Sequence, residues 1–91
     1  MFSEAFLMTK ESKLIEKIES RPPRSDITYS DFERYLSING FVLMRHDGTS
    51  HATFKHSSGD IITVAYHGKH VKVYSIKQAV QIVNSHKEGD V

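Results

Sequence analysis

His51 is the residue whose type and setting best suit acid–base chemistry. It falls in the stretch 50–56, which reads as a strand with Ala52 and Phe54 turned toward a core. His51 and Lys55 then share the opposite face. Because imidazole changes its charge between about pH 5 and 8 and an ammonium group attracts phosphate, this pair is suited to proton transfer on a phosphate. The alternative is an ordinary exposed histidine.

A second group of candidate residues follows the third predicted strand. The run 67–70 reads His-Gly-Lys-His, and Lys72 and Lys77 come soon after it. These residues add positive charge beside the predicted sheet, which favours binding of an anion. A solvated basic loop is the alternative interpretation.

The chain contains no cysteine, so disulfides and thiolate metal sites are excluded. His46, His51 and His56 are spaced by five residues and do not converge on adjacent strands, and His67 and His70 lack a carboxylate nearby in sequence. We therefore expect no metal and no cofactor. Phosphate-binding loops, serine nucleophile elbows and HExxH motifs are also missing from the sequence, which leaves nucleotide-dependent enzymes, serine hydrolases and zinc proteases unsupported.

Charge is unevenly distributed over the 91 residues. Residues 1–40 carry a formal charge of −1, whereas residues 41–87 carry +4 and contain all six histidines. A basic half beside a nearly neutral half is typical of a protein that binds a polyanion, although chance clustering on a solvated surface gives the same pattern.

Three helices are expected to position these residues. Apolar spacing predicts a helix over 13–19 that ends before Pro22. The capping-box sequence at 30–33 predicts the start of a second helix, which the Asn-Gly pair at 39–40 ends. A last helix is expected over 74–85.

Three strands are expected between the second and last helices, over 41–45, 50–56 and 61–66. Their short turns require an antiparallel meander. The fold class is therefore α+β: a three-stranded antiparallel sheet with helices packed on one face and an extra N-terminal helix. This two-layer layout is similar to that of a double-stranded-RNA-binding domain.

A chain of this length is expected to form a single domain over 1–91. Its core should span about 30–84, with a flexible N-terminal extension at 1–8 and a flexible tail at 87–91. No apolar run approaches the ~20 residues that span a bilayer. The first segment lacks the basic start of a signal peptide, so we expect a cytoplasmic protein without membrane contact.

The stretch 40–56 resembles the core of the HicA (YcfA-like) mRNA interferase family. That family carries a glycine, two further residues and an essential histidine, matched here by the run 48–51. A turn glycine matches Gly59, a His-Gly pair matches 67–68, and a Lys-Gln-Ala helix start matches 77–79. The resemblance covers roughly residues 30 to 84.

The resemblance implies the toxin of a type II toxin–antitoxin system with a double-stranded-RNA-binding type of fold. It implies metal-independent endonucleolytic cleavage of single-stranded mRNA, with His51 as the catalytic residue and a HicB-type antitoxin covering the active face. The residues expected to bind RNA are Arg45, Gly48, Thr49, Ser50, Lys55, His67, Lys69, Lys72 and Lys77.

Within that set, His51 suits the base that takes the 2′-OH proton, and Arg45 and Lys55 suit stabilisation of the phosphate charge. His67 suits either the acid for the leaving oxygen or a phosphate ligand. Two other functions stay open: a non-catalytic RNA-binding module of the same fold, and a protein-interaction domain that uses its open sheet edge.

Overall fold

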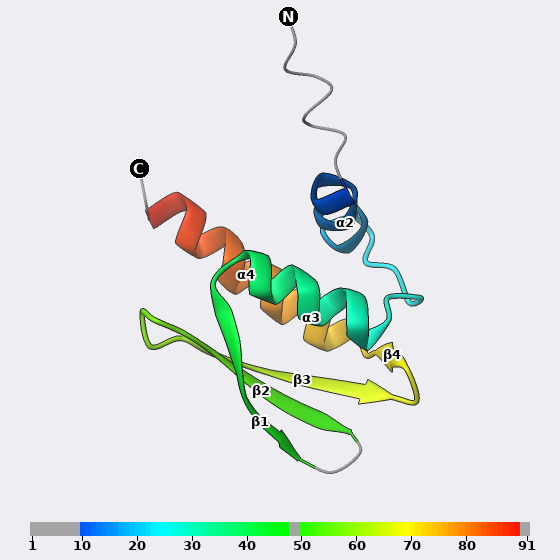
Figure 1. The fold of residues 1–91 in the computed structure, drawn as a ribbon. Helices are drawn as coiled ribbons and strands as arrows, with labels where there is room; N and C mark the ends of the chain where they lie inside the picture. Colours follow the sequence, from blue (N-terminus) through cyan, green and yellow to red (C-terminus); the bar gives the residue numbers. More distant parts are fainter. Residues whose placement is uncertain (1–9, 48–49, 90–91) are drawn as a thin grey trace, which may run out of the picture.

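The computed structural model describes residues 10–47 and 50–89, which form three helices and four strands. In chain order these elements are α2 (Lys10–Ile18), α3 (Tyr29–Ile38), β1 (Phe41–Asp47), β2 (His51–His56), β3 (Ile61–His67), β4 (His70–Val71) and α4 (Val73–Gly89). Helices α3 and α4 lie over one face of the sheet, and α2 packs against α3 (Figure 1). The predicted two-layer α+β fold is confirmed.

The sheet has four antiparallel strands in the order β1-β2-β3-β4, so the predicted count of three is wrong. The added strand arises at Gly68, which has a φ of +62°. This left-handed conformation is accessible to glycine at little steric cost, and it reverses the chain within two residues. His70–Val71 then pairs with Tyr66–His67, a pairing too short for a sequence pattern to reveal.

The core lies between the sheet and the two covering helices. Strand residues that alternate with exposed ones fill it from below, and the predicted apolar stripes of α3 and α4 fill it from above. Each fully buried large apolar side chain contributes about 1.5–3 kcal/mol. The buried residues include Phe41, Ala52, Phe54, Ile62, Val64, Tyr66 and Val71 from the strands, and Phe32, Tyr35, Leu36, Ile76, Ala79 and Val83 from α3 and α4.

The second helix begins earlier than the capping-box sequence predicts. Thr28, with extended φ and ψ of −81° and 155°, is the N-cap, and its Oγ1 accepts the backbone N–H of Asp31 at 3.2 Å. The Tyr29 N–H also donates to the Lys69 carbonyl at 2.8 Å, which ties this end of the helix to the loop before β4. Ser30 is therefore inside the helix, since this long-range contact fixes the start two residues earlier.

Other element boundaries differ from the predicted ones by a few residues. Helix α2 begins at Lys10, β1 extends to Asp47, and α4 extends beyond the predicted end at Ser85 to Gly89. Such shifts are typical because helix and strand ends depend on hydrogen-bond partners as well as on apolar spacing.

Two contacts hold the extra N-terminal helix against α3. Lys17 Nζ lies 3.2 Å from Asp31 Oδ2, and the Tyr35 hydroxyl donates to Glu19 Oε2 at 2.6 Å. Burial of the ring, followed by the nearby carboxylate, raises the pKa of Tyr35 above its ordinary value. The tyrosine therefore stays a neutral donor throughout the physiological pH range.

The Thr28→Ala variant should lower the free energy of unfolding by about 1 kcal/mol, because the Asp31 N–H loses its acceptor. The Ser30→Ala variant should change it by less than about 0.5 kcal/mol, because Ser30 is exposed and is not the cap. Urea unfolding of both variants measures this difference. A larger loss for Ser30→Ala than for Thr28→Ala would restore the capping-box interpretation.

Candidate functional site

The face of the sheet turned away from the helices, called the open face below, carries His51 and Lys55 as the alternation predicted. Both side chains are exposed, whereas Ala52 and Phe54 between them are 1% exposed. The register pairs Arg45 of β1 with Thr53 of β2. Paired residues of antiparallel strands share a face, so Arg45 also projects from the open face, between the levels of His51 and Lys55.

His51 lies at the start of β2, opposite Ala65 of β3. Its Nδ1 is 3.1 Å from Ser50 Oγ. With the imidazole proton on Nδ1 and donated to Ser50, Nε2 carries a free lone pair and can accept a proton. Ala65 itself is buried, at 4% exposure, although it is on the same face as His51.

His67 belongs to the same face as His51. It follows Ala65 by two residues along β3, so it is diagonal to His51 across the β2–β3 pair. Diagonal neighbours of this kind are about 7–8 Å apart. Both imidazoles are exposed, so a group the size of a phosphate has access to both rings.

Two further predicted residues, Lys69 and Lys72, lie beside this pair, around β4. The side chains of Lys69 and Lys72 are exposed, and the Lys72 backbone N–H donates to the Ala65 carbonyl at 2.9 Å. Their positive charge is therefore next to the strand that carries His67. Gly48 and Thr49, which the resemblance placed at the site, lie outside the described residues.

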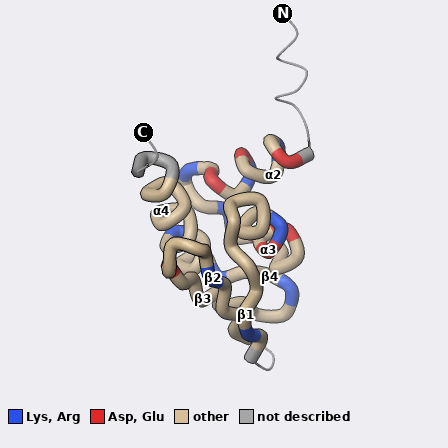
Figure 2. Tube along the Cα trace, turned by 60° about the vertical axis from the view of Figure 1, so that its left-hand side comes forward, with Lys and Arg blue, Asp and Glu red and all other residues tan. Residues whose placement is uncertain are grey.

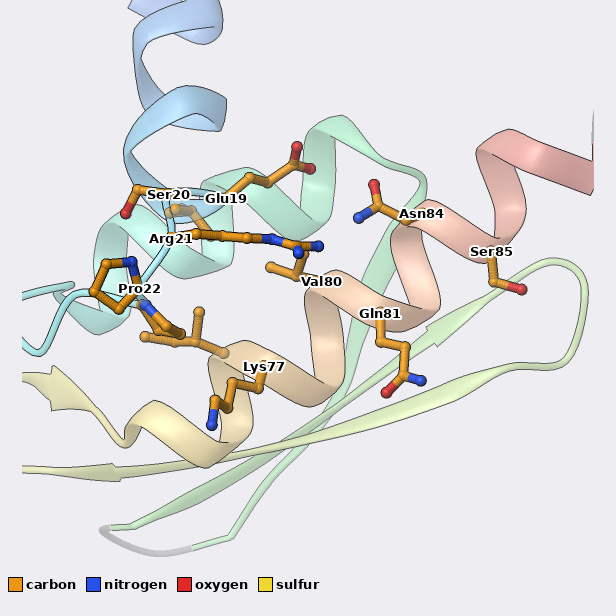
Figure 3. Close-up of a pocket in the computed structure, with 12 residues that line it drawn as sticks. Glu19, Ser20, Arg21, Pro22, Lys77, Val80, Gln81, Asn84 and Ser85 are labelled. Atoms are coloured by element: carbon orange, nitrogen blue, oxygen red, sulfur yellow. The ribbon is translucent and has the colours of Figure 1, made fainter.

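Lys77 lies elsewhere, in a groove between α2 and α4 with a volume of about 720 Å³. Figure 3 shows its side chain on α4 pointing away from Arg21, whose own side chain extends along the groove toward Val80. Apolar side chains such as Ile18 and Val80 line this groove, and no histidine does. The structure therefore separates Lys77 from the other predicted RNA-binding residues.

Three of the remaining histidines, His46, His56 and His86, contact other side chains of the protein. His46 Nε2 hydrogen-bonds the Tyr66 hydroxyl on the helix side of the sheet. The His56 and His86 rings have centroids 4.3 Å apart, and His86 Nε2 lies 2.5 Å from Asp60 Oδ2. The sequence did not indicate this last pair, because 26 residues separate its members.

Metal and membrane binding have no visible support in the described part of the chain. Within residues 10–47 and 50–89, no group of three or more His, Asp or Glu side chains could hold a metal ion. In those same residues, no helix has the length and apolar character needed to cross a bilayer.

Positive charge is distributed along the sheet, in agreement with the sequence. Figure 2 shows Lys or Arg on β1, β2 and the segment beside β4, while acidic and basic positions are mixed on α2 and α3. The open face can therefore attract a polyanion, while the helical layer carries most of the acidic residues.

A comparison with family models identifies one match over residues 29–84, to the family described as HicA toxin of bacterial toxin-antitoxin. The matched range contains α3, all four strands and most of α4, and it leaves out α2. No curated protein and no solved structure matches the chain. The match confirms the resemblance seen in residues 40–56.

Because His51 is exposed and contributes nothing to the core, the His51→Ala variant should keep the free energy of unfolding within about 0.5 kcal/mol of the parent. The Phe54→Ala variant, on the other side of the same strand, should lose about 3–5 kcal/mol. Urea unfolding of the two variants tests the assignment of faces. Comparable losses in both would place His51 in the core instead.

Proposed function

The chain belongs to the HicA toxin family of toxin–antitoxin systems, and from that premise we propose that it is a metal-independent endoribonuclease that cleaves single-stranded mRNA. The observation that supports this proposal most is the exposed His51 on an open basic sheet face, diagonal to a second exposed histidine. Two imidazoles flanking a phosphate-sized space can supply both the base and the acid for transfer of a phosphodiester.

In the proposed reaction, His51 Nε2 takes the proton of the ribose 2′-OH. The 2′-oxygen attacks the phosphorus, and the bond from phosphorus to the 5′-oxygen breaks. His67 gives a proton to that leaving oxygen, so the products are a 2′,3′-cyclic phosphate and a 5′-hydroxyl. In the tautomer in which His51 Nδ1–H donates to the Ser50 hydroxyl, Nε2 is free to take the 2′-OH proton.

Charge on the phosphate rises during this attack, and the neighbouring cations offset it. Arg45 and Lys55 project from the same face as His51 and can offset this charge. Lys55 lies further along β2, and Arg45 lies on β1 opposite Thr53, which is between His51 and Lys55. Lys69 and Lys72 lie on the other side, next to β3, where they can hold the RNA backbone. The line of cations thus follows the sheet rather than surrounding one point, which suits an extended single strand.

The partner implied by the family is an antitoxin, and we propose a HicB-type protein that covers the open face. Val42 and Ile61 both pair with Lys55 in the register, and they are 63% and 55% exposed. Apolar side chains on either side of a basic residue form a surface that a protein can bury more favourably than RNA can. A toxin that acts on mRNA would work in the cytoplasm.

The His51→Ala variant should cleave single-stranded RNA about 10²–10⁴-fold more slowly than the parent, because general base catalysis is lost. Cleavage is measured on a labelled RNA in the presence of a chelator, with toxicity on induced expression as a second readout. The matched control is His86→Ala, since His86 lies on α4 beside Asp60 and away from the open face. Parental cleavage by His51→Ala would contradict the proposed mechanism, and a rate lost to the chelator but restored by zinc would contradict the metal-free route.

The affinity of the His51→Ala variant for single-stranded RNA should fall as salt rises, with a slope of about −0.7 per phosphate contact. Adding Lys55→Ala should reduce the size of this slope by roughly one contact, because one exposed cation of the open face is removed. Lys13→Ala, an exposed cation on α2, is the matched control and should leave the slope unchanged. A salt-independent affinity would instead favour a face that binds protein.

A further inference from the structure

Tyr74, in the first turn of α4, is the only exposed aromatic residue in the described part of the chain. Tyr74 is 61% exposed, whereas the described phenylalanines and the other described tyrosines are buried or half-buried. An exposed tyrosine ring presents a large, flat apolar surface with little conformational freedom to lose on binding.

The other described tyrosines already have partners. The Tyr35 hydroxyl donates to Glu19, the Tyr66 hydroxyl bonds with His46, and the Tyr29 ring packs at 4.8 Å on that of Tyr66. Within residues 10–47 and 50–89, Tyr74 makes no such hydrogen bond or ring contact. Its ring is therefore free to take an external ligand.

The backbone places the first turn of α4 beside the candidate catalytic residue. Ser75 Oγ accepts the backbone N–H of Ala65 at 2.9 Å, and the Lys72 N–H donates to the carbonyl of the same alanine at 2.9 Å. Ala65 in turn is paired with His51. The segment that contains Tyr74 is thus two strand spacings from His51, on the order of 10 Å.

Tyr74 is on the outer side of α4. The helix buries Ser75, Ile76 and Ala79, and the 100° step between residues turns Tyr74 away from that buried side. The ring also takes no part in lining the groove between α2 and α4. Its nearest charged neighbour in sequence is the exposed Lys72, so the ring adjoins a residue able to hold a phosphate.

We propose that Tyr74 is a stacking platform for a nucleobase of the single-stranded RNA, where the strand passes Lys72 on the β4 side of the sheet. This inference rests on the proposed function and deepens it by naming a residue that positions the substrate. Stacking on an aromatic ring accepts every base, because each base has a π-face. Tyr74 contributes to binding and moves no proton.

The test compares Tyr74→Phe with Tyr74→Leu, each combined with His51→Ala so that the RNA stays intact. Tyr74→Phe keeps the ring and should bind single-stranded RNA as the parent does. Tyr74→Leu keeps an apolar side chain without a ring and should bind about 5- to 100-fold more weakly. The salt slope should be equal in both, because no phosphate contact is lost.

A second variant reports the contact directly. The chain contains no tryptophan, so Tyr74→Trp introduces a single tryptophan, whose fluorescence can be excited apart from that of the tyrosines. Its fluorescence should be quenched when RNA binds, and a matched oligonucleotide that lacks its bases but keeps every phosphate should leave it unquenched. Quenching by RNA alone supports stacking, and equal responses to both oligonucleotides overturn it.

Failure of this inference differs from failure of the proposed function. If Tyr74→Leu binds RNA as tightly as Tyr74→Phe, stacking is wrong while RNA binding by the open face stands, and the exposed ring belongs to a protein contact. If the His51→Ala background itself binds no RNA, both proposals are wrong.

Discussion

The alternation of side chains along β2 is the constraint on which the rest of the structure depends. Ala52 and Phe54 must enter the core to cover α3 and α4, and this requirement turns His51 and Lys55 to the other face. A slip of one residue in the pairing would exchange the two sets, burying a histidine and a lysine and exposing the phenylalanine. The hydrophobic core therefore fixes the register that builds the open face.

Stability and chemistry are assigned to different layers of this small domain. The helical layer holds the core, the Thr28 cap and the contact between Tyr35 and Glu19. The open face carries exposed side chains whose removal costs the fold little, so its residues are free to serve binding and catalysis. The Ser75 hydroxyl, buried against Ala65, joins the layers because it fixes the start of α4 beside the strand that carries His67.

Local patterns in the sequence were sufficient to predict the α+β class, the faces of β2 and the apolar stripes of two helices, since each depends on spacing within one element. Features that depend on distant partners were missed. The bridge between Thr28 and His70 and the pair of His86 with Asp60 each join segments far apart in the chain. The fourth strand pairs with the residues just before it, and it was missed because it is only two residues long. The pairing of His51 with Ala65 had no signal, because only the register between β2 and β3 reveals it.

The proposed catalytic role of His51 rests on the family and on the position of the residue, and the proposed chemistry would leave a direct trace in the product. Attack by the 2′-oxygen ends in a 2′,3′-cyclic phosphate and a 5′-hydroxyl, and it cannot occur at a 2′-deoxyribose. The most direct measurement is the chemical identity of the ends left by the parent protein on an RNA, beside the same RNA with a single 2′-deoxy nucleotide at the cleaved position. The account predicts a cyclic phosphate from the first and no cleavage of the second, whereas 5′-phosphate ends or equal cleavage of both would contradict it.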